Sequence, residues 1–112
     1  MSTEQDIQDI ELNIEQARAF VKANDALNRL MENPDFKEVI REGYFKDDAV
    51  RLVELKAAPQ MGSEESQQYI LKALDGIGSL QQYFNTIWHL GEQAKVAIDD
   101  GNEELANMDA AA

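Results

Sequence analysis

The one histidine of the chain, His89, lies three residues before Glu92 in the segment TIWHLGEQ. On a helix this spacing places an imidazole and a carboxylate one turn apart, where they could relay a proton or share a metal ion. A helical di-metal site, however, takes Glu-x-x-His motifs from two helices, and this sequence has no second histidine. We therefore predict that His89 is a surface or interface residue and that the chain is not an enzyme. No catalytic residue, metal or cofactor is expected.

Two further motifs resemble ligand sites only superficially. The segment DDGNEE at 99–104 has the carboxylates of a calcium loop, but it lacks the ligand spacing and the glycine position of the twelve-residue pattern. Gly76 and Gly78 in LDGIGS follow no strand, so they indicate a helix kink or a close helix approach and not a phosphate-binding loop. The absence of cysteine excludes disulfides and thiol chemistry, and is compatible with a reducing cytosol.

The aromatic residues are the better candidates for a function. Two of them stand together in EGYFKDDAVRLVELKAAP at 42–59, and four follow within 69–88. An aromatic stripe is more often core than binding surface, but two long helices cannot by themselves bury apolar stripes on several faces. Unburied patches would then bind a protein partner. We list the candidate protein-interaction residues as Tyr44, Phe45, Tyr69, Tyr83, Phe84 and Trp88.

The net charge of −12 is concentrated at the two ends of the chain. Residues 1–17 and 99–112 each hold five acidic residues and no basic one, whereas residues 18–56 hold eight of each. Binding to nucleic acid or to an anionic membrane needs a basic stripe that displaces counterions. No such stripe is present, so we expect neither a direct nucleic-acid contact nor a membrane contact.

A first long helix is predicted over about 3–31. Ser2 or Thr3 is a suitable N-cap with Gln5 completing a capping box. Isoleucines, an alanine and a valine then recur at spacings of three and four, as one buried helix face requires. These residues are Ile7, Ile10, Ile14, Ala17 and Val21.

Two short helices are predicted over about 34–42 and 47–57. Asn33 and Pro34 form a helix start, and Gly43 is a left-handed stop. Asp47 or Asp48 then caps the second helix, which Pro59 ends. The segment between the two short helices would form a helical corner, in which we expect an ion pair between Asp47 and Arg51. We expect one of Tyr44 and Phe45 to pack against the long helices and the other to be exposed to a partner.

A second long helix is predicted over about 64–98, starting after Ser63. Apolar residues keep an alternation of three and four across four heptads, from Ile70 to Ile98, which is the pattern of a helix packed along another. We favour one helix kinked at Gly76–Gly78, with a break into two helices as the alternative. The remaining residues, 99–112, are predicted to form an acidic, disordered tail.

Together these elements indicate an all-α protein in which the two long helices pair antiparallel, forming a single helical domain over 1–98. The N-terminal segment has neither a basic nor an apolar leader region, and no apolar run reaches the length of a membrane span. We therefore expect a soluble protein that is not secreted.

The segments NPDFKEVIREGYFKDDAVRLVELKAAPQM and GIGSLQQYFNTIWHLGEQA resemble a group of small acidic helical proteins encoded by tailed bacteriophages. The resemblance covers about residues 10–98 and carries no active-site residue. It implies an accessory or virion-associated protein of the host cytoplasm or the virion, which acts by binding phage or host proteins. A homo-oligomeric assembly component is the first hypothesis. The alternative is an acidic inhibitor of a host or defence protein, acting by nucleic-acid mimicry.

Overall fold

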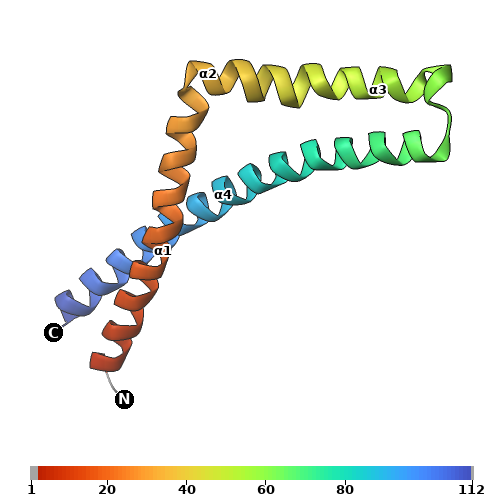
Figure 1. The fold of residues 1–112 in the computed structure, drawn as a ribbon. Helices are drawn as coiled ribbons and strands as arrows, with labels where there is room; N and C mark the ends of the chain where they lie inside the picture. Colours follow the sequence, from red (N-terminus) through yellow and green to blue (C-terminus); the bar gives the residue numbers. More distant parts are fainter. Residues whose placement is uncertain (1–2, 112) are drawn as a thin grey trace. The chain divides into compact units, whose positions relative to one another are not determined.

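The computed structural model describes residues 3 to 111, which are helical almost throughout and contain no strand in that range. The predicted all-α class is therefore confirmed (Figure 1). The elements are α1 (Thr3–Glu32), α2 (Pro34–Phe36), the π-helix η1 (Lys37–Asp48), α3 (Ala49–Ala57), the 3-10 turn η2 (Pro59–Met61) and α4 (Glu64–Ala111).

The chain forms two compact units, and the long helices contribute to both. Unit 1 comprises residues 1–28 and 86–112, and unit 2 comprises residues 29–85. Unit 1 therefore contains most of α1 and the second half of α4. Unit 2 contains α2, η1, α3, η2 and the first half of α4.

In unit 1, α1 and the second half of α4 pack antiparallel. Asn24 lies against Gly91 and Ile14 lies against Gly101, so the contact positions rise along α4 as they fall along α1. The buried residues include Ile14, Ala17 and Ala94. Ile14 and Ala17 belong to the predicted face of the first helix, and Ala94 belongs to the predicted seam of the second. The antiparallel pairing of the long helices is confirmed.

In unit 2, a helical arm over residues 34–57 lies along the first half of α4, with the chain turning at η2 between them (Figure 1). Leu52, Ile70 and Ile77 form its core, with exposed fractions of 1%, 0% and 4%. The turn is fastened by Gln67, whose Nε2 donates hydrogen bonds to the backbone oxygens of Lys56 and Met61. Because burial of these apolar residues supplies the main favourable free energy, the arm forms against α4.

Several predicted helix ends are confirmed by their capping groups. The Asn33 side chain accepts hydrogen bonds from the backbone N–H groups of Asp35 and Phe36, with Pro34 at the first helical position. Ser63 Oγ accepts from the N–H of Ser66, and α3 ends at Ala57, two residues before Pro59. At the start of α1, Ser2 lies outside the described residues and Thr3 is already helical.

The predicted stop at Gly43 is wrong, and with it the separation into two short helices. No residue from 3 to 111 has a positive φ, and Gly43 lies inside η1. Tyr44 and Phe45 directly after it pack against the unit 2 core, so a chain reversal here would remove them from that core. Burial of the arm thus outweighs the helix penalty of glycine, about 1 kcal/mol. Asp48 is correspondingly helical and makes no side-chain cap.

The second long helix is longer than expected at its C-terminal end. It passes through Gly76 and Gly78 without interruption, so the alternative of a break into two helices is wrong. It also continues to Ala111, which makes the predicted disordered tail helical over the described residues. Residues 101, 105 and 108 are half-buried, and Ile10 and Ile14 lie close to Gly101. Packing on α1, which local composition does not reveal, explains this extension.

Candidate functional site

An aromatic cluster occupies the side of unit 2 where the arm meets α4. Phe84 lies at its centre, with ring centroids 5.8 Å from Phe36 and 6.0 Å from Phe45, both in edge-to-face geometry. Tyr83 is also 6.0 Å from Phe84, and Tyr44 is 5.9 Å from Phe45. Edge-to-face pairs are a favourable arrangement of aromatic quadrupoles, so the cluster stabilises the contact between arm and helix.

The six candidate interaction residues divide into two groups. Tyr44, Phe45 and Phe84 are half-buried and belong to the packing of unit 2. Both Tyr44 and Phe45 pack against the core, where one of the two was expected to do so, and a partner contact of either ring stays a prediction. The continuous arm holds both against the core. The other three are exposed on the surface of their own unit: Tyr69 by 65%, Tyr83 by 61% and Trp88 by 46%.

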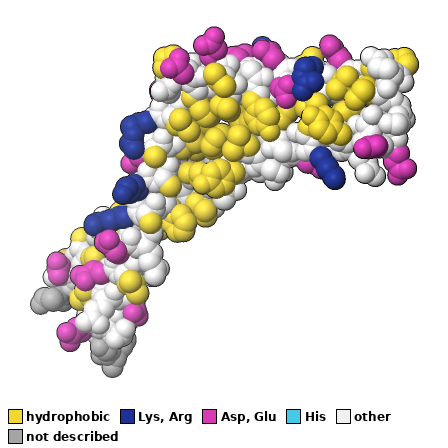
Figure 2. Space-filling view, in the orientation of Figure 1, with side chains coloured by type: hydrophobic (Ala, Val, Ile, Leu, Met, Phe, Trp, Pro, Cys, Tyr) yellow, Lys and Arg dark blue, Asp and Glu magenta, His cyan; other side chains and the backbone are white. Residues whose placement is uncertain are grey.

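Tyr69 and Tyr83 lie on one side of α4. They are 14 residues apart, which at about 100° per residue returns to within about 40° of the same direction. Gly76 and Leu80 fall between them on this side, and we call these four residues the tyrosine stripe. Leu71, 46% exposed, lies on the opposite side of the helix because two residues turn it by about 200°. Hydrophobic side chains gather over unit 2 in Figure 2.

A groove of about 400 Å³ lies beside the aromatic cluster in unit 2. Its apolar walls come from Met31, Phe45 and Phe84, and polar groups come from Arg41 and two amides. An apolar floor with a few polar groups is typical of sites that hold a side chain of a bound molecule. Sequence reasoning missed Met31 and Arg41, because their proximity to Phe84 depends on the packing of the arm along α4.

One ion pair near the tyrosine stripe differs from the prediction. Arg51 Nε donates a hydrogen bond of 2.8 Å to Asp48 Oδ1, three residues earlier, instead of pairing with Asp47. This hydrogen bond is the main cause that raises the pKa of Arg51, followed by the charge of Asp48 and, to a smaller extent, of Tyr69. The hydrogen bond therefore holds the Arg51 guanidinium beside Asp48 on α3.

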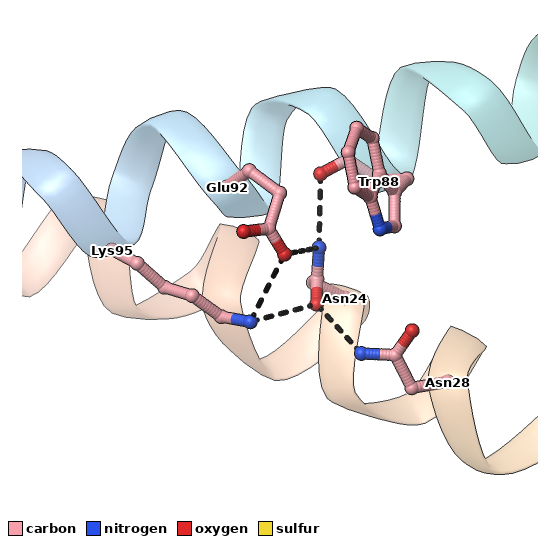
Figure 3. Close-up of polar contacts among 5 residues, drawn as sticks. All are labelled: Asn24, Asn28, Trp88, Glu92 and Lys95. Carbon is pink, nitrogen blue, oxygen red and sulfur yellow. Dashed lines mark hydrogen bonds and ion pairs between the residues drawn. The ribbon is translucent and has the colours of Figure 1, made fainter.

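A buried polar cluster connects the two helices of unit 1 (Figure 3). Asn24 is fully buried, and its Nδ2 donates to the backbone oxygen of Trp88 at 2.9 Å and to Glu92 Oε1 at 3.5 Å. Its Oδ1 accepts from Asn28 Nδ2 at 3.0 Å and from Lys95 Nζ at 3.3 Å. All of the hydrogen-bonding atoms of this buried amide are thus satisfied, as burial of a polar group requires.

The close approach at this cluster depends on Gly91. A Cβ at this position would overlap the Cβ of Asn24 and would lie 2.6 Å from its Cγ. Any side chain at residue 91 would therefore push α1 and α4 apart or displace Asn24. The sequence signal for this contact is a glycine in the apolar seam, but the seam alone does not identify the asparagine that faces it.

His89 is exposed, as predicted for a surface residue, and the Glu92 carboxylate is bound by other groups. The Glu92 carboxylate accepts from Lys95 Nζ at 3.1 Å and contacts Asn24, while the His89 ring lies edge-to-face on Trp88 at 5.0 Å. The segment 99–104 is helical, which spreads its carboxylates around α4. Among residues 3–111, no group of three or more His, Cys, Asp or Glu side chains is arranged to hold a metal ion.

Within the described range, no helix combines the length and apolar character required to cross a membrane. No protein-family model, curated protein or solved structure matches the chain. The geometry of the chain's own residues therefore carries the functional conclusion.

Proposed function

We propose that this chain is a non-enzymatic protein-binding protein that acts through exposed apolar and aromatic side chains on its helices. The observation that carries the proposal is the tyrosine stripe of unit 2, with Tyr69 and Tyr83 more than half exposed on one side of α4. Tyrosine is enriched at protein interfaces because its ring supplies large contact area at low entropy cost while its hydroxyl remains hydrogen-bonded. Two such rings on a rigid helix are suitable anchors for a partner.

The motif resemblance supports a more specific role. The chain would be a structural, assembly or accessory component encoded by a tailed bacteriophage, present in the host cytoplasm, the virion or both. Self-association through the same stripe would give a homo-oligomer. Seven large apolar side chains are at least 39% exposed in unit 2 alone, which supplies the apolar surface that association would bury.

The test removes the two exposed rings without touching the core. The double variant Tyr69→Ser, Tyr83→Ser is compared with Leu71→Ser, which removes an exposed apolar side chain from the opposite side of α4. We expect the double variant to lose a virion or assembly protein that the wild type captures from phage-infected cells, and to weaken any oligomer seen by light scattering. Leu71→Ser should retain both.

Two outcomes would contradict the proposal. One is a wild-type chain that stays monomeric across a concentration series and captures no virion or assembly protein. The other is an equal loss for the double variant and for Leu71→Ser, which would show that exposed apolar area in general, and not the stripe, governs capture.

A second candidate function is acidic inhibition of a nucleic-acid-binding protein. The observation that favours it is the charge of unit 1, which contains 12 of the 22 acidic residues of the chain but only three of the ten basic ones. Mimicry of a phosphate backbone predicts competition with duplex DNA for a basic protein at low salt, lost as salt rises. If the chain displaces no DNA from its captured partner at low salt, mimicry is refuted.

A further inference from the structure

A second surface, independent of the tyrosine stripe, lies in unit 1. Two cavities of about 260 and 270 Å³ open on one side of the pair formed by α1 and α4. They share Asn13 and Ala97 as lining residues, so they join into one groove, which we call the α1–α4 groove. It follows α4 from Leu90 to Glu104, which is about 21 Å or four helical turns.

The α1–α4 groove contains a row of small residues, and the amides of Asn13, Gln16 and Gln93 also line it. Ala17 comes from α1, and Ala94, Ala97 and Gly101 come from α4 at spacings of three and four. Small side chains along two paired helices allow a third helix to approach both of them and to place larger side chains between them. Larger apolar residues line both ends: Phe20, which is 46% exposed, and Leu90 at one end, and Ile10 and Ile14 at the other.

The other end of the groove is acidic. Asp100 and Glu104 line it directly. Asp6 and Asp9 lie on the same side of α1, because each stands seven residues, or two turns, before a lining residue of the groove (Asn13 and Gln16).

Among the described residues of unit 1, no basic side chain pairs with the carboxylates at this end. Arg18 pairs with Glu15 at 3.6 Å, Lys95 pairs with Glu92 at 3.1 Å, and neither they nor Lys22 line the groove. The acidic end therefore favours a positively charged occupant.

We propose that the α1–α4 groove binds an amphipathic helix of a partner protein, with small or aliphatic residues on its inner face and lysine or arginine beside Asp100 and Glu104. The occupant is a helix because the groove is straight, about four turns long and walled by two helices. Its charge follows from the uncompensated carboxylates at the rim. Unit 1 of a second copy is a poor occupant, because it carries the same excess of acidic residues and would repel this end.

The probe is a fluorescent synthetic helix of about 18 residues with leucine and alanine at the heptad core positions and lysine outside. Its controls are a scrambled peptide of the same composition and a peptide with glutamate in place of lysine. Anisotropy is measured at low and high salt, since rim ion pairs weaken as salt screens them. We expect only the amphipathic lysine peptide to bind, with both controls at least tenfold weaker.

Two sets of variants of the full chain locate the binding. Asp100→Asn with Glu104→Gln removes the rim charges, and Asp99→Asn with Glu103→Gln makes the same change on residues of the same turns that do not line the groove. Since an exposed ion pair changes affinity by about a two- to fivefold factor, the first pair should weaken binding about three- to tenfold and the second less than twofold. All four carboxylates are exposed, and substitutions at exposed positions change stability little, so both pairs should keep their helical content.

The third variant fills the groove. Ala97 is an exposed floor residue, and Ala97→Gln places a longer helix-compatible side chain where the peptide would lie. We expect binding to weaken at least tenfold with circular dichroism unchanged.

Four results would each overturn the proposal. These are absence of peptide binding, equal binding of the scrambled peptide, equal effects of the two acid pairs, and full binding by Ala97→Gln. A wild-type dimer that Ala97→Gln converts to monomer would likewise overturn it, because a second copy would then cover the groove. Since no variant touches the tyrosine stripe, loss of this proposal leaves the proposed function standing.

Discussion

Replacing Gly91 by alanine is expected to destabilise unit 1, whereas the same change at Gly78 is expected to stabilise the chain. Both glycines lie inside α4 at negative φ, so alanine gains up to about 1 kcal/mol of helix propensity at each. At Gly78 a new Cβ meets nothing within 4 Å. At Gly91 it would overlap the Cβ of Asn24 and lie 2.6 Å from its Cγ.

The size of the Gly91→Ala effect follows from two losses. Overpacking a tight contact costs about 1–3 kcal/mol. Moving Asn24 away from the backbone oxygen of Trp88 leaves buried polar groups without partners, at about 1–3 kcal/mol. After the propensity gain is subtracted, Gly91→Ala should lower the free energy of unfolding by about 1–5 kcal/mol. Gly78→Ala should raise it by about 0.5–1 kcal/mol.

Urea unfolding of both variants tests whether the two substitutions change the free energy of unfolding in opposite directions. Far-ultraviolet circular dichroism follows all helices, and the fluorescence of Trp88, the only tryptophan, follows unit 1. We expect the Trp88 transition of Gly91→Ala to move to lower urea and that of Gly78→Ala to stay or rise. If both substitutions raised the midpoint equally, the close approach of Asn24 and Gly91 would be refuted.

Three further predictions concern unit 2. Leu52→Ala should lower the free energy of unfolding by about 2–5 kcal/mol, because Leu52 is 1% exposed in the core. Leu71→Ala, at an exposed position, should change it by less than about 0.5 kcal/mol. Equal urea midpoints of the two variants would contradict the core assignment. Asn33→Ala should cost about 1 kcal/mol through loss of its two capping hydrogen bonds, and Asn33→Asp, which keeps an acceptor, should restore most of it. Tyr44→Ala and Phe45→Ala should both lower the thermal midpoint, since both rings pack on the core. If one variant lost partner capture at an unchanged thermal midpoint, the ring that it removes would be a binding residue and not a core residue.

The candidate surfaces were only partly accessible to prediction. Tyr69 and Tyr83 were identified from the sequence because they lie outside the apolar seam of α4, and they are exposed on their unit. Phe45 and Phe84 were identified for the same aromatic character, but they pack against each other. The residue type alone does not distinguish an exposed aromatic ring from a packed one, because the exposure of a ring depends on which other residues of the unit contact it.

The α1–α4 groove was beyond sequence reasoning for a related reason. Ala97 and Asp100 belong to α4 just before and inside the segment expected as a disordered tail. Antiparallel pairing of the long helices already places the two acidic ends together, but the helix continues through residues 99–111 because it packs on Ile10 and Ile14 of α1.

What the sequence by itself determined is the local structure. This includes the caps at Asn33 and Ser63, the helix end before Pro59 and the apolar seam of α4. Each of these features depends on backbone groups and side chains within a few residues, so the local sequence is sufficient to predict it. What the tertiary structure decided is where long-range burial overrides those signals. Gly43 remains helical because Tyr44 and Phe45 pack on the opposite helix, and Asn24 is buried because Gly91, 67 residues later in the sequence, leaves room for it. The free energy of such contacts depends on partners that no local pattern specifies.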